Sequence, residues 1–346
     1  MSKKVILLGG AGFIGHHLAL SYVAKGFDVV ICDSFQVNNL VTMLDSEHNV
    51  HEPKLYREIL DERLSLLSKA AVKLKVTDLR SKHEIKEIFD QEEPDIVVLL
   101  AAVAHASRSD KDPDLAFDNG IIPLQNTLEA IRERAKIRFV YMSTSTIYGH
   151  FKKDIVDESD SVNPFGVYAT YKFIGEKMVM CYGEKFNLDY SIIRPSALYG
   201  ERCISRRVSQ IFIESAIANR ELIVSADEDE KLDFTYIQDL VDAIVAVSDS
   251  PKGSQETFNI TFGNARPIYM LTEILKDYFP KLQITKTKRN EFLPKRGTLS
   301  NKKLIDLIGY KPQFELEIGY RKYIEWYIDF VKSKDIYLSK IPQANE

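Results

Sequence analysis

Two groups of residues, far apart in the chain, have the types and spacing needed for redox chemistry on a hydroxyl or carbonyl group. Gly9, Gly12 and Gly15 follow a short apolar segment and open a segment with helical character. Tyr168 and Lys172 lie four residues apart, so a helix would place both on one face. In this order, the two groups predict a dinucleotide site followed by a tyrosine that acts as a base.

The three glycines have separate physical roles in such a site. A tight turn requires positive φ, a pyrophosphate requires close backbone approach, and the helix must contact the sheet closely. The helix N-terminus then offers free N–H groups to the phosphates. Asp33 ends the next apolar segment, where a carboxylate accepts hydrogen bonds from an adenosine ribose and repels a 2′-phosphate. The predicted cofactor is therefore NAD rather than NADP.

A second acidic position, Asp78, has two possible roles. Asp78 follows the third predicted strand. It could reach the amino group of the adenine, or it could cap the helix that comes next.

The tyrosine needs help to act as a base near neutral pH. A lysine ammonium beside the phenol is expected to lower the tyrosine pKa from its usual value of about 10. Tyr168 could then take the hydroxyl proton while hydride leaves the carbon. Ser143, Thr144 and Ser145 close a predicted strand upstream, and a hydroxyl there could bond the same substrate oxygen.

The elements that must position these groups alternate along the first half of the chain. Short segments that are almost wholly apolar predict buried parallel strands at 5–8, 29–32, 72–76, 96–100, 139–142 and 191–193. Helical segments lie between them at about 13–25, 81–91, 114–135 and 168–186. The pattern predicts an α/β fold with a Rossmann-type, doubly wound parallel sheet.

The length of 346 residues suits two lobes. Residues 1–193 are predicted to form the NAD-binding domain, with an insertion at about 36–70 that reaches the adenosine end or a subunit contact. Residues 194–346 are predicted to form mainly a smaller C-terminal substrate-binding lobe. A segment near 235–250 is expected to return to the first domain as a helix.

Composition excludes several classes of protein. The formal net charge of −4 argues against broad attraction to nucleic acid or membranes. The longest apolar stretch, 96–104, is far shorter than the roughly 20 residues of a membrane span. The three cysteines have no CxxC spacing, so we expect no metal site but reduced core or pocket thiols in a cytoplasmic protein.

Several motifs together resemble the extended short-chain dehydrogenases/reductases of the nucleotide-sugar epimerase/dehydratase family. In order they read GGAGFIG, LLAAVAH, STSTIYG, YATYK, RPSALYG and LDFTYIQDLVDAI, and the similarity spans about residues 4–330. The resemblance implies Thr144, Tyr168 and Lys172 as the catalytic set. It also implies a nucleoside-diphosphate sugar between the lobes, and a homodimer or higher oligomer formed through helix 168–186 and the long helix before it. The residues expected to bind the cofactor are Gly9, Gly12, Phe13, Ile14, Gly15, Asp33, Asp78, Leu79, Ala101, Ala102, Ser143, Tyr168 and Lys172.

The residues after Thr144 divide the family by chemistry. Dehydrating relatives carry an Asp-Glu pair there, decarboxylating relatives usually carry a glutamate, and relatives that invert C3 or C5 use a cysteine. Here the positions hold Ser145 and Thr146, so the resemblance favours epimerisation through a transient 4-keto sugar. A one-way 4-dehydrogenase or reductase is the alternative. A non-catalytic NAD-binding sensor is less favoured, because such proteins commonly lose the tyrosine or the lysine.

Substrate contacts depart from the family pattern. Ala197 stands where relatives have an asparagine, and Leu232 where they have an arginine. Arginine forks match phosphate oxygens, so nearby arginines could replace these contacts, although they could equally form a solvated helix face. Residues after the fourth strand could face the sugar, although the histidine among them could equally be structural. The predicted substrate-binding residues are His105, Arg108, Ser109, Arg206, Arg207 and Arg296.

Overall fold

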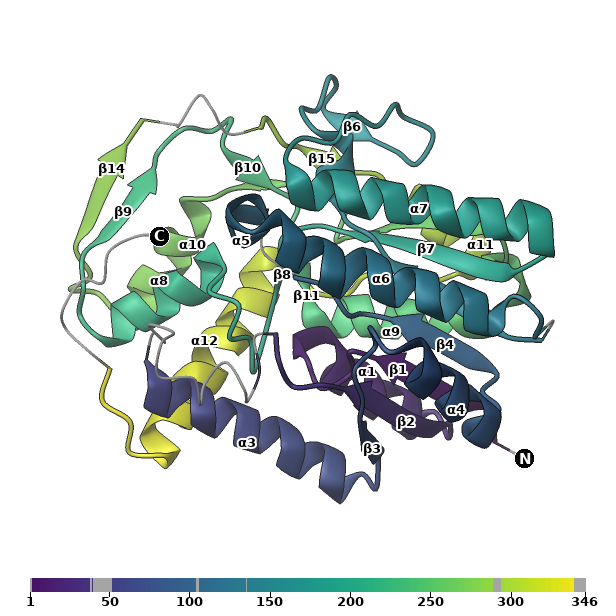
Figure 1. Ribbon diagram of the computed structural model, residues 1–346. Coiled ribbons are helices and arrows are strands. Elements are labelled where there is room, and N and C mark those ends of the chain that lie inside the picture. The colour runs from purple at the N-terminus through teal and green to yellow at the C-terminus, as the bar shows by residue number, and fades with distance from the viewer. Residues whose placement is uncertain are drawn as a thin grey trace.

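The apolar segments assemble into one parallel sheet of seven strands in the order β12-β7-β5-β4-β1-β2-β3 (Figure 1). The computed structural model describes residues 2–37, 39, 52–103, 106–134, 136–288 and 294–338. The predicted Rossmann-type sheet is confirmed. Its strands are β1 (Lys4–Leu8), β2 (Asp28–Asp33), β3 (Lys73–Val76), β4 (Ile96–Leu99), β5 (Arg138–Met142), β7 (Asp189–Pro195) and β12 (Glu256–Ile260).

Helices cover both faces of the sheet, which is why the inner strands are apolar on both sides. Alternate residues of β1 enter different cores: Leu7 belongs to the core beneath α1 and α9, and Ile6 to the core beneath α4, α6 and α7. These helices span Phe13–Ala24 (α1), Ile237–Asp249 (α9), Lys82–Glu92 (α4), Pro113–Ile131 (α6) and Val167–Phe186 (α7).

The seventh strand was not predicted from the sequence. Among the described strands, β12 pairs only with β7, at the edge of the sheet, and its Thr257 and Asn259 break the apolar run that marks the inner strands. α9, which precedes β12, packs against α1. Both elements come after the start of the second lobe, so the sheet and its covering are built from two separate stretches of chain.

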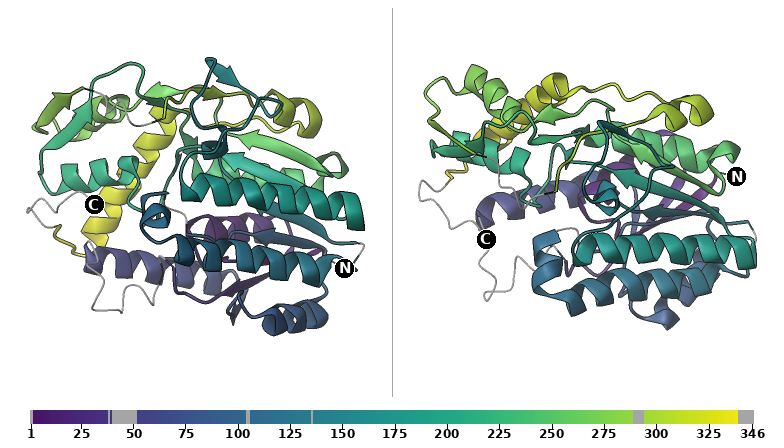
Figure 2. Two further views of the ribbon diagram at one scale, coloured as in Figure 1. Left: turned by 45° about the horizontal axis from the view of Figure 1, so that its top comes forward. Right: turned by 90° about the horizontal axis from the view of Figure 1, so that it is seen from above.

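The second lobe gathers around α8 (Val208–Ile217), α10 (Met270–Tyr278) and the C-terminal helix α12 (Leu316–Ser333). Both views of Figure 2 place α12 and the insertion helix α3 (Pro53–Lys69) at the end of the molecule away from the N-terminus. Smaller elements complete the lobe and its junction: α5 (Ala106–Lys111), β6 (Ile155–Val156), β8 (Leu198–Tyr199), β9 (Leu222–Ser225), β10 (Lys231–Leu232), β11 (Thr235–Tyr236), β13 (Arg266–Pro267), β14 (Ile284–Thr287), β15 (Thr298–Leu299) and α11 (Lys302–Ile308).

The surface of α7 differs from one expectation. Cys32 and Cys203 are buried, but Cys181 is exposed on α7 and is neither a core nor a pocket thiol. The apolar side chains exposed on this helix are Ile174 and Phe186. The predicted homo-oligomer through this helix stays a prediction.

None of the helices in the described ranges is long and apolar enough to cross a membrane.

Gly15 tests the close contact between α1 and the turn before it. A Cβ on Gly15 would lie 2.4 Å from the Gly10 carbonyl oxygen, which is backbone and cannot yield without moving the turn. We expect Gly15→Ala to lower the free energy of unfolding by about 1–3 kcal/mol. Gly120→Ala is the control, because nothing lies within 4 Å of its added Cβ inside α6. It should raise stability by about 0.5–1 kcal/mol in urea unfolding. Equal effects of the two changes would contradict this reading of the turn.

Candidate active site

The candidate site lies where the strand order reverses. The chain passes from β1 through β2 to β3 on one side and from β4 through β5 to β7 on the other, so a crevice opens at the carboxyl ends of β1 and β4. A pocket of about 960 Å³ there is lined by Gly9, Gly12 and Asp33. A second pocket of about 1000 Å³ is lined by Thr144, Tyr168 and Lys172. The two pockets share several residues: Ile14, Leu100, Ala102, Leu198 and Arg207.

The glycine turn has the geometry that the sequence predicted. Gly9 has φ +81°, and a Cβ there would lie 2.6 Å from the Ala101 backbone nitrogen. Gly12 is the N-cap of α1 and has no side chain to cap the helix, and the first N–H groups of a helix lack partners within it, so they can bind an anion. The predicted cofactor residues that line this first pocket are Gly9, Gly12, Phe13, Ile14, Gly15, Asp33, Asp78, Leu79, Ala101 and Ala102.

Asp33 is held firmly at the end of β2. Its two carboxylate oxygens accept hydrogen bonds from the backbone N–H groups of Ala11 (2.9 Å) and Phe35 (2.8 Å). Burial raises the pKa of this carboxyl, and these two hydrogen bonds oppose that shift. A carboxylate has about four acceptor positions, so Asp33 keeps capacity to receive the ribose hydroxyls.

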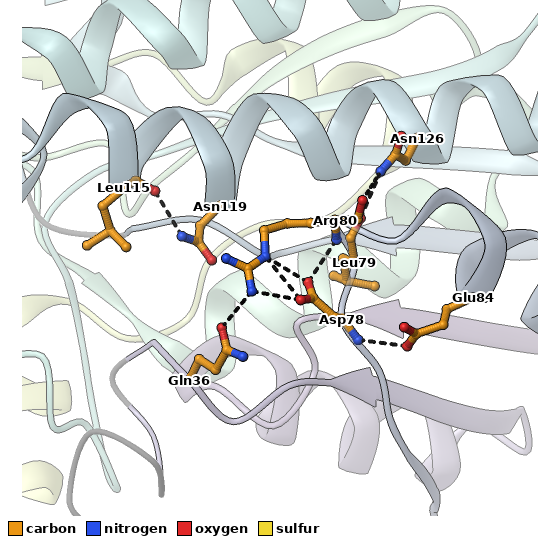
Figure 3. Close-up of polar contacts among 8 residues, drawn as sticks. All are labelled: Gln36, Asp78, Leu79, Arg80, Glu84, Leu115, Asn119 and Asn126. Carbon is orange, nitrogen blue, oxygen red and sulfur yellow. Dashed lines mark hydrogen bonds and ion pairs between the residues drawn. The ribbon is translucent and has the colours of Figure 1, made fainter. Parts of the chain in front are cut away.

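Figure 3 shows what surrounds Asp78. Its carboxylate forms an ion pair with Arg80 (2.7 Å), and Arg80 also donates to Gln36 (3.2 Å). The helix cap is Ser81, which accepts a hydrogen bond from Glu84, so the capping interpretation of Asp78 is wrong. Arg80 lines the same pocket and was not predicted, although a cation just beyond a strand end was a signal for it.

The reaction end of the crevice brings α7 against the loop after β5. Tyr168 and Lys172 project from α7, and Thr144 caps the short 3-10 helix η1 (Ser145–Tyr148). The Thr144 hydroxyl lies beside Tyr168 and acts to lower the pKa of that tyrosine. Lys172 Nζ donates to the Met142 carbonyl oxygen at 2.6 Å.

The pKa values at this end differ from the expectation for the pair. Burial raises the pKa of Tyr168, opposed by the charge of Arg207 and by the Thr144 hydroxyl, so the expected lowering by Lys172 is not seen. Burial lowers the pKa of Lys172 to about 8, against the opposing charge of Glu176. A lysine titrating near 8 changes charge more readily than an exposed one.

A buried ion pair fixes α7 to the sheet. Glu176 accepts two hydrogen bonds from Arg194 of β7, at 2.9 and 2.7 Å. Arg194 also donates to the hydroxyl of Tyr148 in η1 (2.8 Å), and Tyr148 donates to Asn259 of β12 (2.8 Å). One guanidinium therefore joins the helix that carries Tyr168 to the turn that carries Thr144.

The predicted substrate arginines lie in different surroundings. Arg207 lines both pockets, and its buried Nε has no hydrogen-bond partner among the described residues. Arg206 has the same unpaired Nε but does not belong to the described lining of these pockets. Arg296 donates to the Ser145 carbonyl oxygen (3.1 Å), and burial lowers its pKa to about 10.

The residues after β4 are only partly placed. Ser109 is buried on α5 and lines a small pocket with Tyr168 and Lys172. Arg108 is half-buried on the same helix and is not among the described residues that line the three pockets. His105 lies outside the described residues.

The crevice fits the dinucleotide that the sequence predicted. The second pocket is lined by Ser143, whose hydroxyl is buried without a hydrogen-bond partner among the described residues. The first pocket is lined by the start of α1, where no side chain caps the helix, and by Asp33. The crevice therefore offers N–H groups for an anion, an acceptor for a ribose and an unpaired hydroxyl.

A family model described as "NAD dependent epimerase/dehydratase family" matches residues 5–261. The chain belongs to this family. NAD is thus its cofactor, as predicted, and the catalytic set expected from the sequence lies beside the second pocket.

Individual relatives of the family include both of its chemistries. UDP-glucuronate 4-epimerase 1 of Arabidopsis thaliana is 27% identical over 348 residues, covering 94% of this chain and 77% of that protein. dTDP-D-glucose 4,6-dehydratase of Mus musculus is 26% identical over 344 residues, covering 94% and 89%. The fold matches the crystal structure of UDP-glucuronic acid 4-epimerase from Bacillus cereus in complex with UDP-glucuronic acid and NAD. The TM-score is 0.80 at 24% identity, over 94% of this chain and 99% of that one.

The Glu176–Arg194 pair is open to a stability test. Glu176→Leu leaves the buried Arg194 charge without its counter-charge, so we expect the free energy of unfolding to fall by about 3–5 kcal/mol. Adding Arg194→Met should recover a large part of that loss in urea unfolding. Glu87→Gln, in an exposed pair with His83 on α4, is the control and should change stability by less than about 0.5 kcal/mol. A double variant as unstable as the single one would contradict the pairing argument.

Proposed function

We propose that this family member is an epimerase that inverts a carbon of a nucleoside-diphosphate sugar through a transient 4-keto intermediate. The observation that carries the proposal is the lining of the second pocket. Within the described part of that lining, Tyr168 and Lys172 are the side chains able to exchange a proton, and no aspartate, glutamate or cysteine accompanies them. Ser145 and Thr146 occupy the positions beside Thr144. This supports chemistry that requires one base and hydride transfer, and it argues against elimination of water.

The mechanism assigns each step to a side chain on the pocket wall. Tyr168 accepts the proton of the C4 hydroxyl, and Thr144 bonds the same oxygen as it becomes a carbonyl. When bound, NAD supplies reversible hydride acceptance from C4. Tyr168 then returns the proton after the keto sugar presents its other face. Burial raises the pKa of Tyr168, and the charge of Arg207 and the hydroxyl of Thr144 oppose that rise, which is the direction that the first step requires.

The diphosphate of the substrate is assigned to two arginines of the second lobe. We favour Arg207 with Arg296, because Arg207 lines both pockets and has a buried N–H free for an acceptor. Arg296 comes from a distant part of the chain and donates a hydrogen bond to the backbone of Ser145, beside Thr144. A guanidinium matches the paired oxygens of a phosphate, which supports this choice over a solvated helix face. A nucleoside-diphosphate sugar would then extend from these arginines toward Tyr168.

The reaction is tested with purified protein, without added NAD, on a panel of UDP- and GDP-sugars followed by NMR. We expect interconversion of two C4 epimers and no net formation of NADH, because the hydride returns to the same carbon. In a parallel reaction with NAD added, net reduction of NAD without formation of an epimer would instead indicate a one-way dehydrogenase. Loss of water to a 4-keto-6-deoxy sugar would indicate a dehydratase. Either result would overturn the proposal.

Tyr168→Phe removes the proposed base and leaves the cofactor crevice intact. We expect kcat to fall by about a hundredfold to ten-thousandfold, while NAD binding measured by fluorescence titration changes little. Tyr182→Phe is the matched control on the same helix, because Tyr182 bonds Gln125 and Glu129 away from the crevice. It should keep full activity. A Tyr168→Phe protein with unchanged kcat would remove the tyrosine from the mechanism.

A further inference from the structure

Arg63, on the insertion helix α3, is a buried cation that the catalytic scheme does not use. Its side chain is 1% exposed, yet it lines the first pocket together with Gly12, Gly15 and Asp33. The insertion therefore contributes a charged group to the crevice in which the dinucleotide lies. Nothing in the glycine motif or in the strand pattern of the sequence points to it.

Two of the three guanidinium nitrogens are already committed. Nε donates to the Arg202 carbonyl oxygen at 3.0 Å, and Nη2 donates to the same oxygen. These two nitrogens form one edge of the planar fork, so the side chain is held in a single orientation. The remaining nitrogen, Nη1, is buried and has no hydrogen-bond partner among the described residues. A structural role for Arg63 explains the first edge but leaves Nη1 unexplained.

The surroundings of Nη1 point to an anionic acceptor. A buried N–H without an acceptor carries a desolvation penalty, and this penalty is larger when the group is charged. A ligand that accepts a hydrogen bond from it removes the penalty and so binds more tightly. Asp33 is a carboxylate whose charge acts on Arg63, but it forms no hydrogen bond with Nη1. The guanidinium of Arg202 contacts the rings of His16 and His17 and the carboxylate of Glu62. The anion that family membership brings to this pocket is the pyrophosphate of NAD.

We infer that Arg63 Nη1 is a cofactor contact that binds the pyrophosphate of the dinucleotide beside the N-terminus of α1. The insertion helix then forms one wall of the NAD site. Because the same guanidinium holds the Arg202 carbonyl oxygen, Arg63 also ties this wall to the segment that leads to Arg206 and Arg207. The α1 N-terminus and Arg63 would approach the pyrophosphate from two different elements.

The test is the affinity of Arg63→Gln for NAD, with etheno-NAD displaced by NAD, ADP-ribose or adenosine and followed by fluorescence. Gln keeps an N–H donor for the Arg202 carbonyl oxygen but lacks the charge and the second edge. We expect affinity for NAD and ADP-ribose to fall about tenfold to a hundredfold, the usual range for a charge-assisted hydrogen bond. Affinity for adenosine, which has no phosphate, should stay within about twofold.

A matched control separates the contact from general damage to α3. Arg220 is also nearly buried and pairs with Glu52 at the start of α3, but it is not among the described residues that line the pockets. Arg220→Gln should leave the NAD affinity within about threefold. An unchanged NAD affinity in Arg63→Gln would overturn the proposal. So would an equal loss for adenosine and ADP-ribose, which would show damage to the ribose site.

A second variant covers the case in which Arg63→Gln does not fold. Arg63→Lys keeps a cation that can hold the Arg202 carbonyl oxygen, but its compact ammonium cannot also reach into the pocket. We expect a folded protein, by its thermal unfolding midpoint, with NAD affinity reduced at least about tenfold. Unchanged affinity in this variant would likewise overturn the proposal. These measurements need no sugar substrate, so they stand or fall independently of the epimerase assay.

Discussion

The reaction end of the molecule depends on one buried guanidinium. Arg194 lies on β7, the strand next to the edge of the sheet, and bonds both Glu176 on α7 and Tyr148 in η1. A buried charge is tolerated only when its hydrogen bonds are satisfied, which leaves few positions for the groups around it. Tyr168 lies two helical turns before Glu176, and Thr144 lies one residue before η1. The orientation of the proposed base and its hydroxyl partner is thus set by an ion pair that touches neither of them.

A second buried carboxylate, Glu214, joins helices of the second lobe to the insertion helix α3. Glu214 on α8 accepts hydrogen bonds from Tyr56 on α3 and Tyr327 on α12, at 3.2 and 2.6 Å. Gln210 bonds both Glu214 and Tyr56. The insertion helix is therefore docked by polar contacts with defined geometry, as well as by apolar packing. Its Arg63 reaches the cofactor pocket from a helix that the second lobe holds in place.

Much of this arrangement could be predicted from the sequence, and the parts that could not share a physical cause. The inner strands and the glycine turn follow from local patterns, namely unbroken apolar runs and a motif that needs positive φ at Gly9. β12 was missed because an edge strand with polar residues has no such pattern. Arg63 was missed because its place in the crevice depends on how distant segments pack, whereas Arg80 follows a strand end and could have been found there. The pKa of Tyr168 was misjudged for a related reason: burial, which no i, i+4 spacing reveals, outweighs the nearby charges.

The position of β12 has a consequence for how the chain reaches its folded state. The sheet is completed by residues 256–260, and one of its faces is covered partly by α9, both made after β8 and α8 of the second lobe. A growing chain that ends near residue 200 would expose the apolar surface of α1 and the open edge of β7. Such surfaces and edges favour association between unfinished chains. Synthesis must therefore continue to residue 260, well into the second lobe, before the sheet of the first lobe and its covering are complete.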